Sequence, residues 1–520
     1  MFKNKISSIF VVLCCFALLI CTMNAGCQQE TNSSKEDIDL SSKEKNPVFE
    51  FAKTITLEEL KEHVYYLSSD EMEGRQSGSK GAEAAALYAA NLFKENNLTG
   101  FFLGEEDYFQ IFNMEKREVV ECSLENENGR ASNWQDFLEI SNDFYGEREL
   151  DVYFLGYGRE KDFEGIAIAG KLVSFWSGDP ESNKSPGDID REKSALAVEL
   201  GAAGSILVPQ NEEQFLDYIQ QIKPYFPAIR YYLFKNPDEA LDSQRNISIS
   251  ASALANLFGK RPEEFEALKK LKSSPKDKFP TLSTKVRMKT SFKSHGIIPT
   301  KNVLGFIEGT DKKEEYIILS AHYDGRGIVD GKICNGANDN ATGVSAMLEI
   351  AQAYSFAVEN GCRPRRSIIF FLPAAEELLG LGSTYYVDNP VVSLSNTVVD
   401  VNMDPLGRED AERPDLDNHV YIYTSKNGKK NLNNVRAKAE KDFSASLNIK
   451  EKNNYSGSDF VFFERKGIPA IAFTTGSCKD NHGPGDDANK IQYQKLKDVA
   501  RLIFATVWEI ANRQERIKFP

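Results

Sequence analysis

The sequence predicts an α/β protein built around a largely parallel or mixed sheet. From residue 302 to the C-terminus, short apolar segments alternate with longer segments of helical periodicity, which is typical of strands connected by helices. Hydrophobic residues make up 41% and charged residues 27% of the 520 residues, so the chain can bury a large core. No apolar run reaches the roughly 20 residues that are needed to cross a bilayer.

The elements of the fold are expected in the following order. A helical region with a turn at Gly78-Ser79 spans 56–97, because apolar residues such as Leu60 and Leu92 recur at helical spacing. Beyond residue 302, the expected strands are 303–307, 316–321, 367–372, 397–403 and 468–473, and the expected helices are 341–358 and 493–510. Between these two parts, residues 117–294 change to short strands and turns without a cluster of potential ligands, which indicates a separate inserted module.

The first residues have the order of an export signal. Two lysines precede an apolar run at 9–21, and Ala25-Gly26-Cys27 follows it. We therefore expect residues 1–26 to be a signal peptide of the bacterial lipoprotein type, with Cys27 acylated, although Asn24 stands where such signals usually have leucine. A plain signal peptide is the alternative. Residues 27–50 are expected to be a flexible tether, which would place an exported, lipid-anchored protein in the cell envelope.

Charge limits the possible partners. The chain has 63 Lys and Arg against 77 Asp and Glu, a formal net charge of −14. This balance argues against nucleic acid as a partner.

Metal-binding residue types follow the predicted strands one after another. Because the carboxyl ends of parallel strands meet at one edge of a sheet, these side chains are expected to lie together. The residues are His322 and Asp324 after the strand at 316–321, Asp339 before the next helix, Glu376 and Glu377 after 367–372, Asp404 after 397–403, and His482 beyond 468–473.

The charge of this set predicts two metal ions. Asp339, Glu377 and Asp404 supply −3 and the two histidines are neutral, so one divalent ion leaves the cluster negative, whereas two supply +4 and leave a slight positive excess. Nitrogen and oxygen ligands of this kind suit zinc, which lowers the pKa of a bound water. Glu376 is free to take the proton of that water, and Asp324 to hold the second ring nitrogen of His322.

Each piece has a simpler interpretation when it is taken alone. A His-x-Asp pair can lie on the surface, Glu376-Glu377 can favour a helix dipole, and Asp339 can cap a helix. The order of the whole set after successive strands favours catalysis. The remaining histidines, His63, His295 and His419, lack such a context and are expected in the surface or the core.

The stretch AHYDGRG…NGANDNATG…AAEELLGLGS…NMDPLGR…NHGPGDDANKI resembles the dizinc exopeptidase family of aminopeptidase Y and glutamate carboxypeptidase II, metallopeptidase family twenty-eight. The resemblance covers 56–113 and 302 to the C-terminus. It implies that Asp339 bridges two zinc ions, that His322 and Asp404 bind one of them and that Glu377 and His482 bind the other. It also implies Glu376 as general base, Asp324 as the partner of His322, and a cis peptide bond between Asp339 and Asn340.

The resemblance also implies the domain organisation. Residues 51–116 and 295–520 would form the zinc exopeptidase domain, an α/β/α sandwich of the phosphorylase/hydrolase-like type with a mixed sheet. The motifs FLGYG, GKLVSFWSG and ELGAAGSILV make residues 117–294 similar to the mostly β protease-associated domain that many members carry. Such a domain is usually interpreted as a lid or substrate filter, and an inert spacer is the alternative.

Three positions depart from the family pattern. Asn481 stands where the family often has a tyrosine that steadies the oxyanion, and either Asn481 or Tyr455 could replace it. Pro405 follows Asp404 where a larger apolar residue is common. Phe460 stands where the family often has histidine, and no ligand is lost.

The expected activity is that of a metallo-aminopeptidase that removes N-terminal residues from peptides through a water activated by two metals. A carboxypeptidase of the glutamate-releasing type needs an arginine cluster, for which Arg326, Arg408 and Arg465 are the candidates. A non-enzymatic, receptor-like binding protein on the same fold is a second alternative. A glutaminyl cyclase is a weaker one, since the inserted domain is unusual for that group.

Overall fold

The computed structural model describes residues 47–104, 107–139, 146–223, 226, 228–234, 245–270, 281–426, 429–453, 455 and 457–517. The predicted signal peptide, the acylation site Cys27 and the tether up to residue 46 lie outside the described residues. The N-terminal unit, residues 1–53, contains the short helix α2 (Pro47–Ala52), so the last residues of the predicted tether are helical, with proline at the favoured first position. Residues 54–520 form one compact unit. No helix among the described residues is long and apolar enough to span a membrane.

A mixed sheet forms the centre of the part that carries the predicted ligands. Four parallel strands lie in the order β17 (Ala470–Thr474), β14 (Thr397–Met403), β10 (Lys312–Ser320) and β13 (Arg366–Leu372). On one side β9 (Leu282–Ile307) pairs antiparallel with β13, and on the other β15 (His419–Thr424) pairs antiparallel with β17 and parallel with β16 (Asn448–Lys452). Every residue of β13 and β14 is buried, as in strands that are covered on both faces. The predicted α/β class with a mixed sheet is confirmed.

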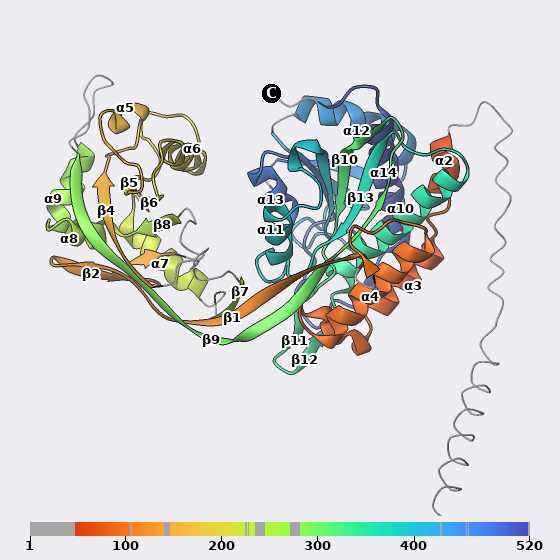
Figure 1. Cartoon of the computed structure of the whole chain (residues 1–520), viewed down its shortest axis with the longest axis horizontal. Helices are drawn as coiled ribbons and strands as arrows, with labels where there is room; N and C mark the ends of the chain where they lie inside the picture. The colour runs from red at the N-terminus through yellow and green to blue at the C-terminus, as the bar shows by residue number, and fades with distance from the viewer. Residues whose placement is uncertain are drawn as a thin grey trace, which may run out of the picture. The chain divides into compact units, whose positions relative to one another are not determined.

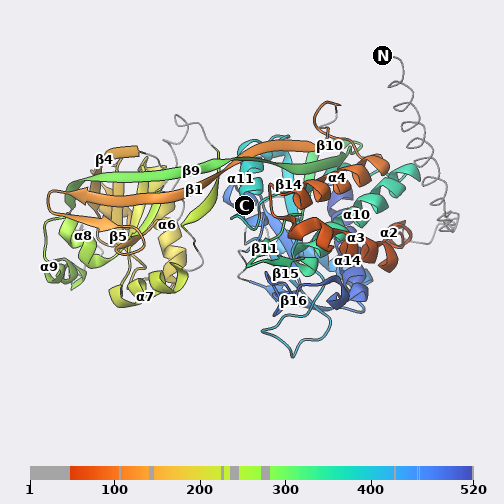
Figure 2. The ribbon, with the colours of Figure 1, turned by 90° about the horizontal axis from the view of Figure 1, so that it is seen from below.

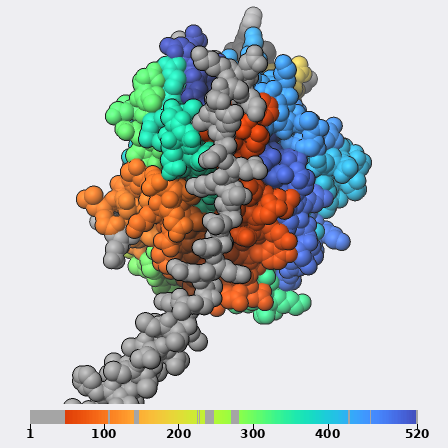
Figure 3. Space-filling view, turned by 90° about the vertical axis from the view of Figure 1, so that its right-hand side faces the viewer, coloured from red at the N-terminus to blue at the C-terminus, as the bar shows by residue number. Residues whose placement is uncertain are grey.

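Helices cover both faces of this sheet (Figure 1). One layer contains α3 (Leu57–Leu67), α4 (Lys80–Glu95), α10 (Thr342–Glu359) and α14 (Tyr493–Asn512), and α12 (Lys429–Phe443) packs against α14. The other layer contains α11 (Leu381–Asp388) and α13 (Phe460–Arg465), whose Tyr386 and Phe463 pack in an apolar cluster with Ile369 of β13. The helices α3 and α14 come from opposite ends of this unit and lie against each other, so orange-red and blue surfaces adjoin in Figure 3.

The inserted segment is joined to the sheet by two long strands. β1 (Phe109–Asn126) pairs antiparallel with β9 along most of its length (Figure 2). β9 also pairs with β4 (Gly146–Phe154) through its first part and with β13 through its last part. The predicted boundaries at 117 and 294 therefore lie inside continuous strands.

Within the insert, parallel strands β4, β5 (Leu172–Trp176), β6 (Gly204–Val208) and β8 (Arg245–Ile249) surround a core of their own that includes Trp176 and Phe265. The other elements of the insert are β2 (Gly129–Ser132), β3 (Phe137–Leu138), α5 (Glu160–Phe163), α6 (Pro186–Glu199), α7 (Glu212–Ile222), β7 (Ile229–Leu233), α8 (Ala251–Leu257) and α9 (Pro262–Ala267).

Short elements connect the helices and strands near the carboxyl ends of the parallel strands. A tight 3-10 segment, η1 (Asp70–Arg75), precedes α4, and the hairpin β11 (Gly327–Val329) and β12 (Lys332–Cys334) follows β10. The turn η6 (Ala337–Ala341) leads into α10. These are the connections that carry or support the predicted ligands.

Candidate metal centre

The five predicted ligands converge at the carboxyl ends of the parallel strands. His322 follows β10, Glu377 follows β13 and Asp404 follows β14, while His482 lies on the loop beyond β17. Asp339 lies on η6, and its bond to Asn340 is a cis peptide. These residues lie far apart in the sequence. The parallel strands bring them together at one edge of the sheet.

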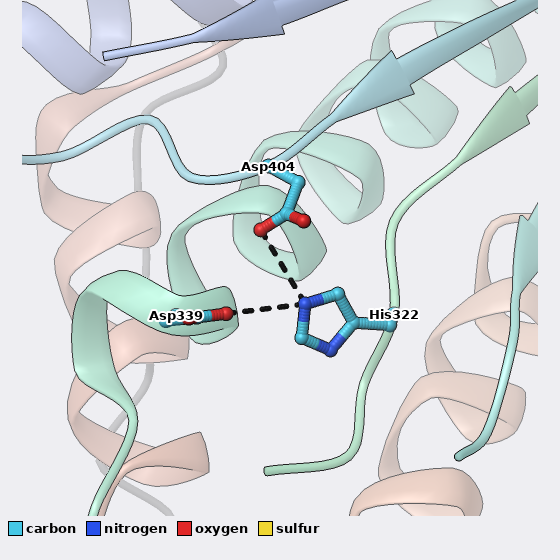
Figure 4. A group of neighbouring side chains, drawn as sticks. All are labelled: His322, Asp339 and Asp404. Carbon is cyan, nitrogen blue, oxygen red and sulfur yellow. Dashed lines mark ion pairs between the residues drawn. The ribbon is translucent and has the colours of Figure 1, made fainter. Parts of the chain in front are cut away.

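The first group consists of His322, Asp339 and Asp404 (Figure 4). His322 Nε2 lies 3.1 Å from Asp339 Oδ1 and 3.4 Å from Asp404 Oδ1. All three side chains are almost completely buried.

The second group consists of Asp339, Glu377 and His482. His482 Nε2 lies 3.1 Å from Asp339 Oδ2 and 3.4 Å from Glu377 Oε2. The two oxygens of Asp339 thus face different groups, as a bridging carboxylate requires. His482 has a positive φ of 58°, and its side chain is 49% exposed, so this half of the centre is the more open one.

The spacing and the hydrogen bonding of these atoms both fit zinc. Ligand atoms at about 2.0–2.2 Å from a tetrahedral zinc lie about 3.3–3.6 Å apart, close to the distances of 3.1 and 3.4 Å within both groups. His322 Nε2 and Glu377 Oε1 are buried polar atoms with no hydrogen-bond partner among the described residues. Buried polar atoms without a partner are costly, and one cation in each group would offset that cost.

Asp324 connects His322 to the predicted base. His322 Nδ1 lies 3.2 Å from the backbone carbonyl of Asp324 and 3.6 Å from its carboxylate, so the carbonyl is the closer acceptor for the ring. The carboxylate of Asp324 accepts a hydrogen bond of 3.1 Å from the backbone N–H of Glu376. One residue therefore orients both the imidazole and the turn that carries Glu376.

Glu376 lies beside the two groups without belonging to either. Its Oε2 is 4.0 Å from His322 Nε2, and its side chain is 20% exposed. The turn is shaped by Ala375, which has a positive φ of 57° and whose N–H donates to the buried Ser77 hydroxyl at 2.8 Å. Glu376 is thus held next to the ligands and within reach of solvent.

Crowded carboxylates determine the protonation of the centre when no cation is present. Burial, followed by the negative charge of Asp339, raises the pKa of Glu377 to about 7. Burial and the charges of neighbouring carboxylates raise the pKa of Glu376 well above its ordinary value. For Asp339, burial is outweighed by hydrogen bonds to His322 and His482, so the pKa falls below its usual range. Without a cation, the surroundings of Glu376 and Glu377 therefore favour the neutral form of both side chains.

The residues considered for the oxyanion lie close to the ligands. The Tyr455 hydroxyl donates a hydrogen bond of 2.9 Å to the backbone carbonyl of Asp404. Asn481 Oδ1 is buried without a partner among the described side chains and backbone groups. The Tyr455 hydroxyl therefore helps to hold the end of the strand that carries Asp404.

The three remaining histidines have partners elsewhere. His63 bonds to Tyr88 and Glu349, His295 pairs with Glu118, and His419 contacts the carbonyls of Leu416 and Thr475. None of these three is part of a metal-binding group among the described residues.

Two buried charged residues near the centre were missed in the sequence. Arg75 ends η1, and Asp486 follows His482 on the same loop; both contact the segment that carries Asp339. The only signals are Gly-Arg within a helical region and Gly-Asp-Asp after the last ligand, and neither motif indicates a partner by itself.

Comparisons with known proteins agree with this geometry. Residues 302–507 match the model described as peptidase family M28. The match confirms the predicted resemblance to this metallopeptidase family over residues 302–507.

Among curated proteins, aminopeptidase YwaD of Bacillus subtilis is 25% identical over 377 residues, 71% of this chain and 68% of the relative. Transferrin receptor protein 1 of Gallus gallus is 27% identical over 256 residues, covering 45% of this chain and 31% of the receptor. A glutamate carboxypeptidase 2 homolog of Caenorhabditis elegans is 25% identical and is matched over 48% of its length. The chain thus spans less than half of the last two relatives.

Among solved structures, the aminopeptidase from Aneurinibacillus sp. strain AM-1 is similar with a TM-score of 0.47 and 20% identity, over 91% of this chain and 98% of that one. BSAP, a zinc aminopeptidase from Bacillus subtilis, is similar with a TM-score of 0.45 and 20% identity, over 89% of this chain and 99% of that one.

Proposed function

We propose that this M28 peptidase is a zinc-dependent aminopeptidase that releases N-terminal residues from peptides and uses two zinc ions. The observation that carries the proposal is the arrangement of Asp339, whose two oxygens face two separate ligand groups, each within the spacing that zinc requires. The relative that is matched over most of its length, YwaD, bears the name aminopeptidase.

Each residue of the centre has a separate role in the proposed hydrolysis. Two zinc ions, when bound by the five ligands, polarise the scissile carbonyl and lower the pKa of the attacking water. Glu376 accepts the proton of that water and passes it to the nitrogen of the leaving amine, so the carboxyl returns to its starting state. Asp324 positions both the imidazole of His322 and the turn that carries Glu376, through one hydrogen bond to each. The partly exposed edge at Glu376 and His482 is where the peptide enters.

The neighbouring glutamates provide a matched pair of variants. Glu376→Gln is expected to bind zinc as the wild type does and to lose hydrolysis of aminoacyl nitroanilides by about 10²–10⁴-fold, the range for a general base. Glu377→Gln is expected to lose zinc from the open half of the centre. Zinc content and turnover are measured on both proteins, and near-normal turnover in Glu376→Gln would refute the assignment of the base.

A carboxypeptidase is the second candidate, and the arginines argue against it. Arg408 binds Asp480 at 2.8 Å, and Arg465 lies 5.0 Å above the ring of Phe462. Of these three candidates, Arg326 is the one that approaches a predicted ligand, at 3.5 Å from Glu377. These three guanidinium groups form no cluster for a C-terminal carboxylate.

Blocked peptides separate the two exopeptidase activities. An aminopeptidase cleaves peptides with an amidated C-terminus and fails on those with an acetylated N-terminus, and a carboxypeptidase shows the opposite preference. A receptor-like protein cleaves neither, and it would also be indicated by the absence of zinc after mild purification.

We further propose that the protein is an exported lipoprotein anchored through Cys27. The order of charged, apolar and small residues before this cysteine supports the proposal. Labelled palmitate should be incorporated into the wild type and not into Cys27→Ser, which should appear in the soluble fraction. Equal labelling of the two proteins would rule out Cys27 as the acylation site.

A further inference from the structure

The segment that carries the shared ligand Asp339 is too irregular to hold itself in place. It connects the end of β12 at Cys334 to the start of α10 at Thr342, through Gly336 with φ 59° and ψ 46°. Its residues are almost all buried, so its backbone groups need partners other than water. The Thr342 hydroxyl donates to Asn338 O and the Ala341 N–H to Gly336 O, and two charged residues outside the ligand set supply further partners.

Arg75 binds the carbonyl side of the segment. Its Nη1 donates to Asn335 O at 2.8 Å and its Nη2 to Gly336 O at 2.8 Å. Its Nε donates to Tyr323 O at 2.9 Å, the residue next to His322. One guanidinium therefore ties the segment of Asp339 to the segment of His322.

This arginine is unusual because its partners are neutral. It is fully buried, and the described residues that accept its hydrogen bonds, including Leu67, all do so through backbone carbonyls. Burial lowers the pKa of Arg75, and the carboxylates that oppose this effect are Asp486, Asp324, Asp339 and Glu377. The positive charge is thus balanced by the acids of the metal centre.

Asp486 binds the amide side of the same segment. Its carboxylate accepts hydrogen bonds of 3.0 Å from the N–H groups of both Asn338 and Asp339, and its backbone carbonyl accepts one of 3.1 Å from Ala337. Asp486 is 1% exposed and lies on the loop of His482. It therefore ties the segment of Asp339 to the segment of His482.

We propose that Arg75 and Asp486 are positioning residues that set the separation of the two halves of the metal centre. Arg75 fixes Asp339 relative to His322, and Asp486 fixes it relative to His482. The inference rests on the proposed zinc site, and it concerns metal affinity rather than the peptide that is cleaved. Loss of Arg75 or Asp486 is expected to shift one oxygen of Asp339 away from its group. Apart from the contacts of Asp339 with His322 and His482 themselves, no other charged side chain among the described contacts joins these segments.

The test uses Asp486→Asn and Arg75→Lys with two matched controls. Asparagine keeps the size of Asp486 but turns an amide donor toward backbone donors, and lysine keeps the charge of Arg75 but cannot bind several carbonyls as a planar fork. Asp480→Asn removes a carboxylate from the His482 loop that binds Arg408 instead of the Asp339 segment. Arg366→Lys alters another fully buried arginine that donates to carbonyls, those of Ile510 and Arg513.

Zinc affinity is measured on metal-free protein by competition with a chromogenic chelator, together with the visible spectrum after cobalt loading, circular dichroism and the unfolding midpoint. Both test variants should bind zinc about 10–100-fold more weakly, show an altered cobalt spectrum and lower kcat more than they change KM. Both controls should lose stability and keep zinc affinity within about twofold of the wild type.

The inference is overturned if the test variants are folded and less stable but bind zinc and cobalt as the wild type does, because the two residues would then be structural only. It also falls if the wild type binds no zinc. A wild type that binds two zinc ions tightly and cleaves no peptide would refute the proposed function and leave the positioning role to be decided by the affinities.

Discussion

The stability of Asp400→Asn relative to the wild type is expected to increase as pH rises from 4 to 7. Asp400 lies in the middle of β14, fully buried, and neither carboxyl oxygen has a hydrogen bond of good geometry among the described residues. Burial raises its pKa well above the ordinary value; the Ser320 hydroxyl opposes this, and the charges of Asp459 and Glu464 on the α13 side add to it. Tyr386 of α11 is the other titratable group beside it.

The sign and size of the effect follow from proton binding. In the unfolded chain this carboxyl loses its proton near pH 3.8, whereas in the folded protein it keeps the proton to a higher pH. Between these two pKa values the folded state binds one more proton, so the free energy of unfolding falls as pH rises, by about 1.4 kcal/mol per pH unit. Asparagine does not titrate. The variant should therefore gain stability relative to the wild type as pH rises, by up to about 1.4 kcal/mol per pH unit over the range in which the folded carboxyl keeps its proton.

Urea unfolding of the wild type and Asp400→Asn, both free of metal, at several pH values from 4 to 7 measures this difference. The carboxylates of the metal centre titrate in both proteins and cancel in the comparison. The buried amide has a cost of its own, but that cost is constant with pH, so the slope is the quantity of interest. A difference that does not change between pH 4 and pH 7 would show that Asp400 is ionised in the folded protein.

Further predictions concern the metal centre. Chelation of the metal should lower the unfolding midpoint, and free zinc at about 1,000 times its dissociation constant should restore about 4 kcal/mol of stability, measured by unfolding at a series of zinc concentrations. Asp339→Asn should lose both zinc ions and Asp404→Asn one, as determined by metal analysis; equal stoichiometry in the two variants would contradict the bridging role. Arg326→Met should leave the hydrolysis of amidated peptides within about threefold of the wild type, since the guanidinium has no substrate carboxylate to bind; a loss restricted to peptides with a free C-terminus would instead favour the carboxypeptidase.

The buried strands were predicted well because a strand that is covered on both faces is a nearly continuous apolar run, which is easy to recognise in a sequence. The strand expected at 397–403 coincides with β14, and the expected helix at 493–510 lies within α14. In contrast, only the last residues of β9 were expected as a strand. Its first part alternates buried and exposed residues and carries many lysines and threonines, and its regular structure depends on pairing with β1, far away in the chain.

The candidate site was predictable where a side chain itself carries the chemistry. His322, Asp404 and Glu377 follow strands directly, so strand order alone indicated their convergence. Arg75 and Asp486 could not be predicted in the same way, because their partners are backbone groups. The irregular conformation of that backbone segment has no recognisable sequence pattern. A sequence motif indicates which side chain is a ligand or a catalytic group. A side chain that binds backbone groups of another segment can be recognised only in the three-dimensional structure.

The two halves of the centre differ in what supports them, and this difference explains why a clamp is needed. His322 and Asp404 come directly from adjacent strands, β10 and β14, whose ladder fixes their positions, and both are buried. His482 is half exposed, lies on a loop and has no strand of its own at this point. Asp486, four residues further on, fixes the position of His482 relative to Asp339, as the sheet fixes the ligands of the other half. The open half can therefore admit a peptide and still keep its ligand in place.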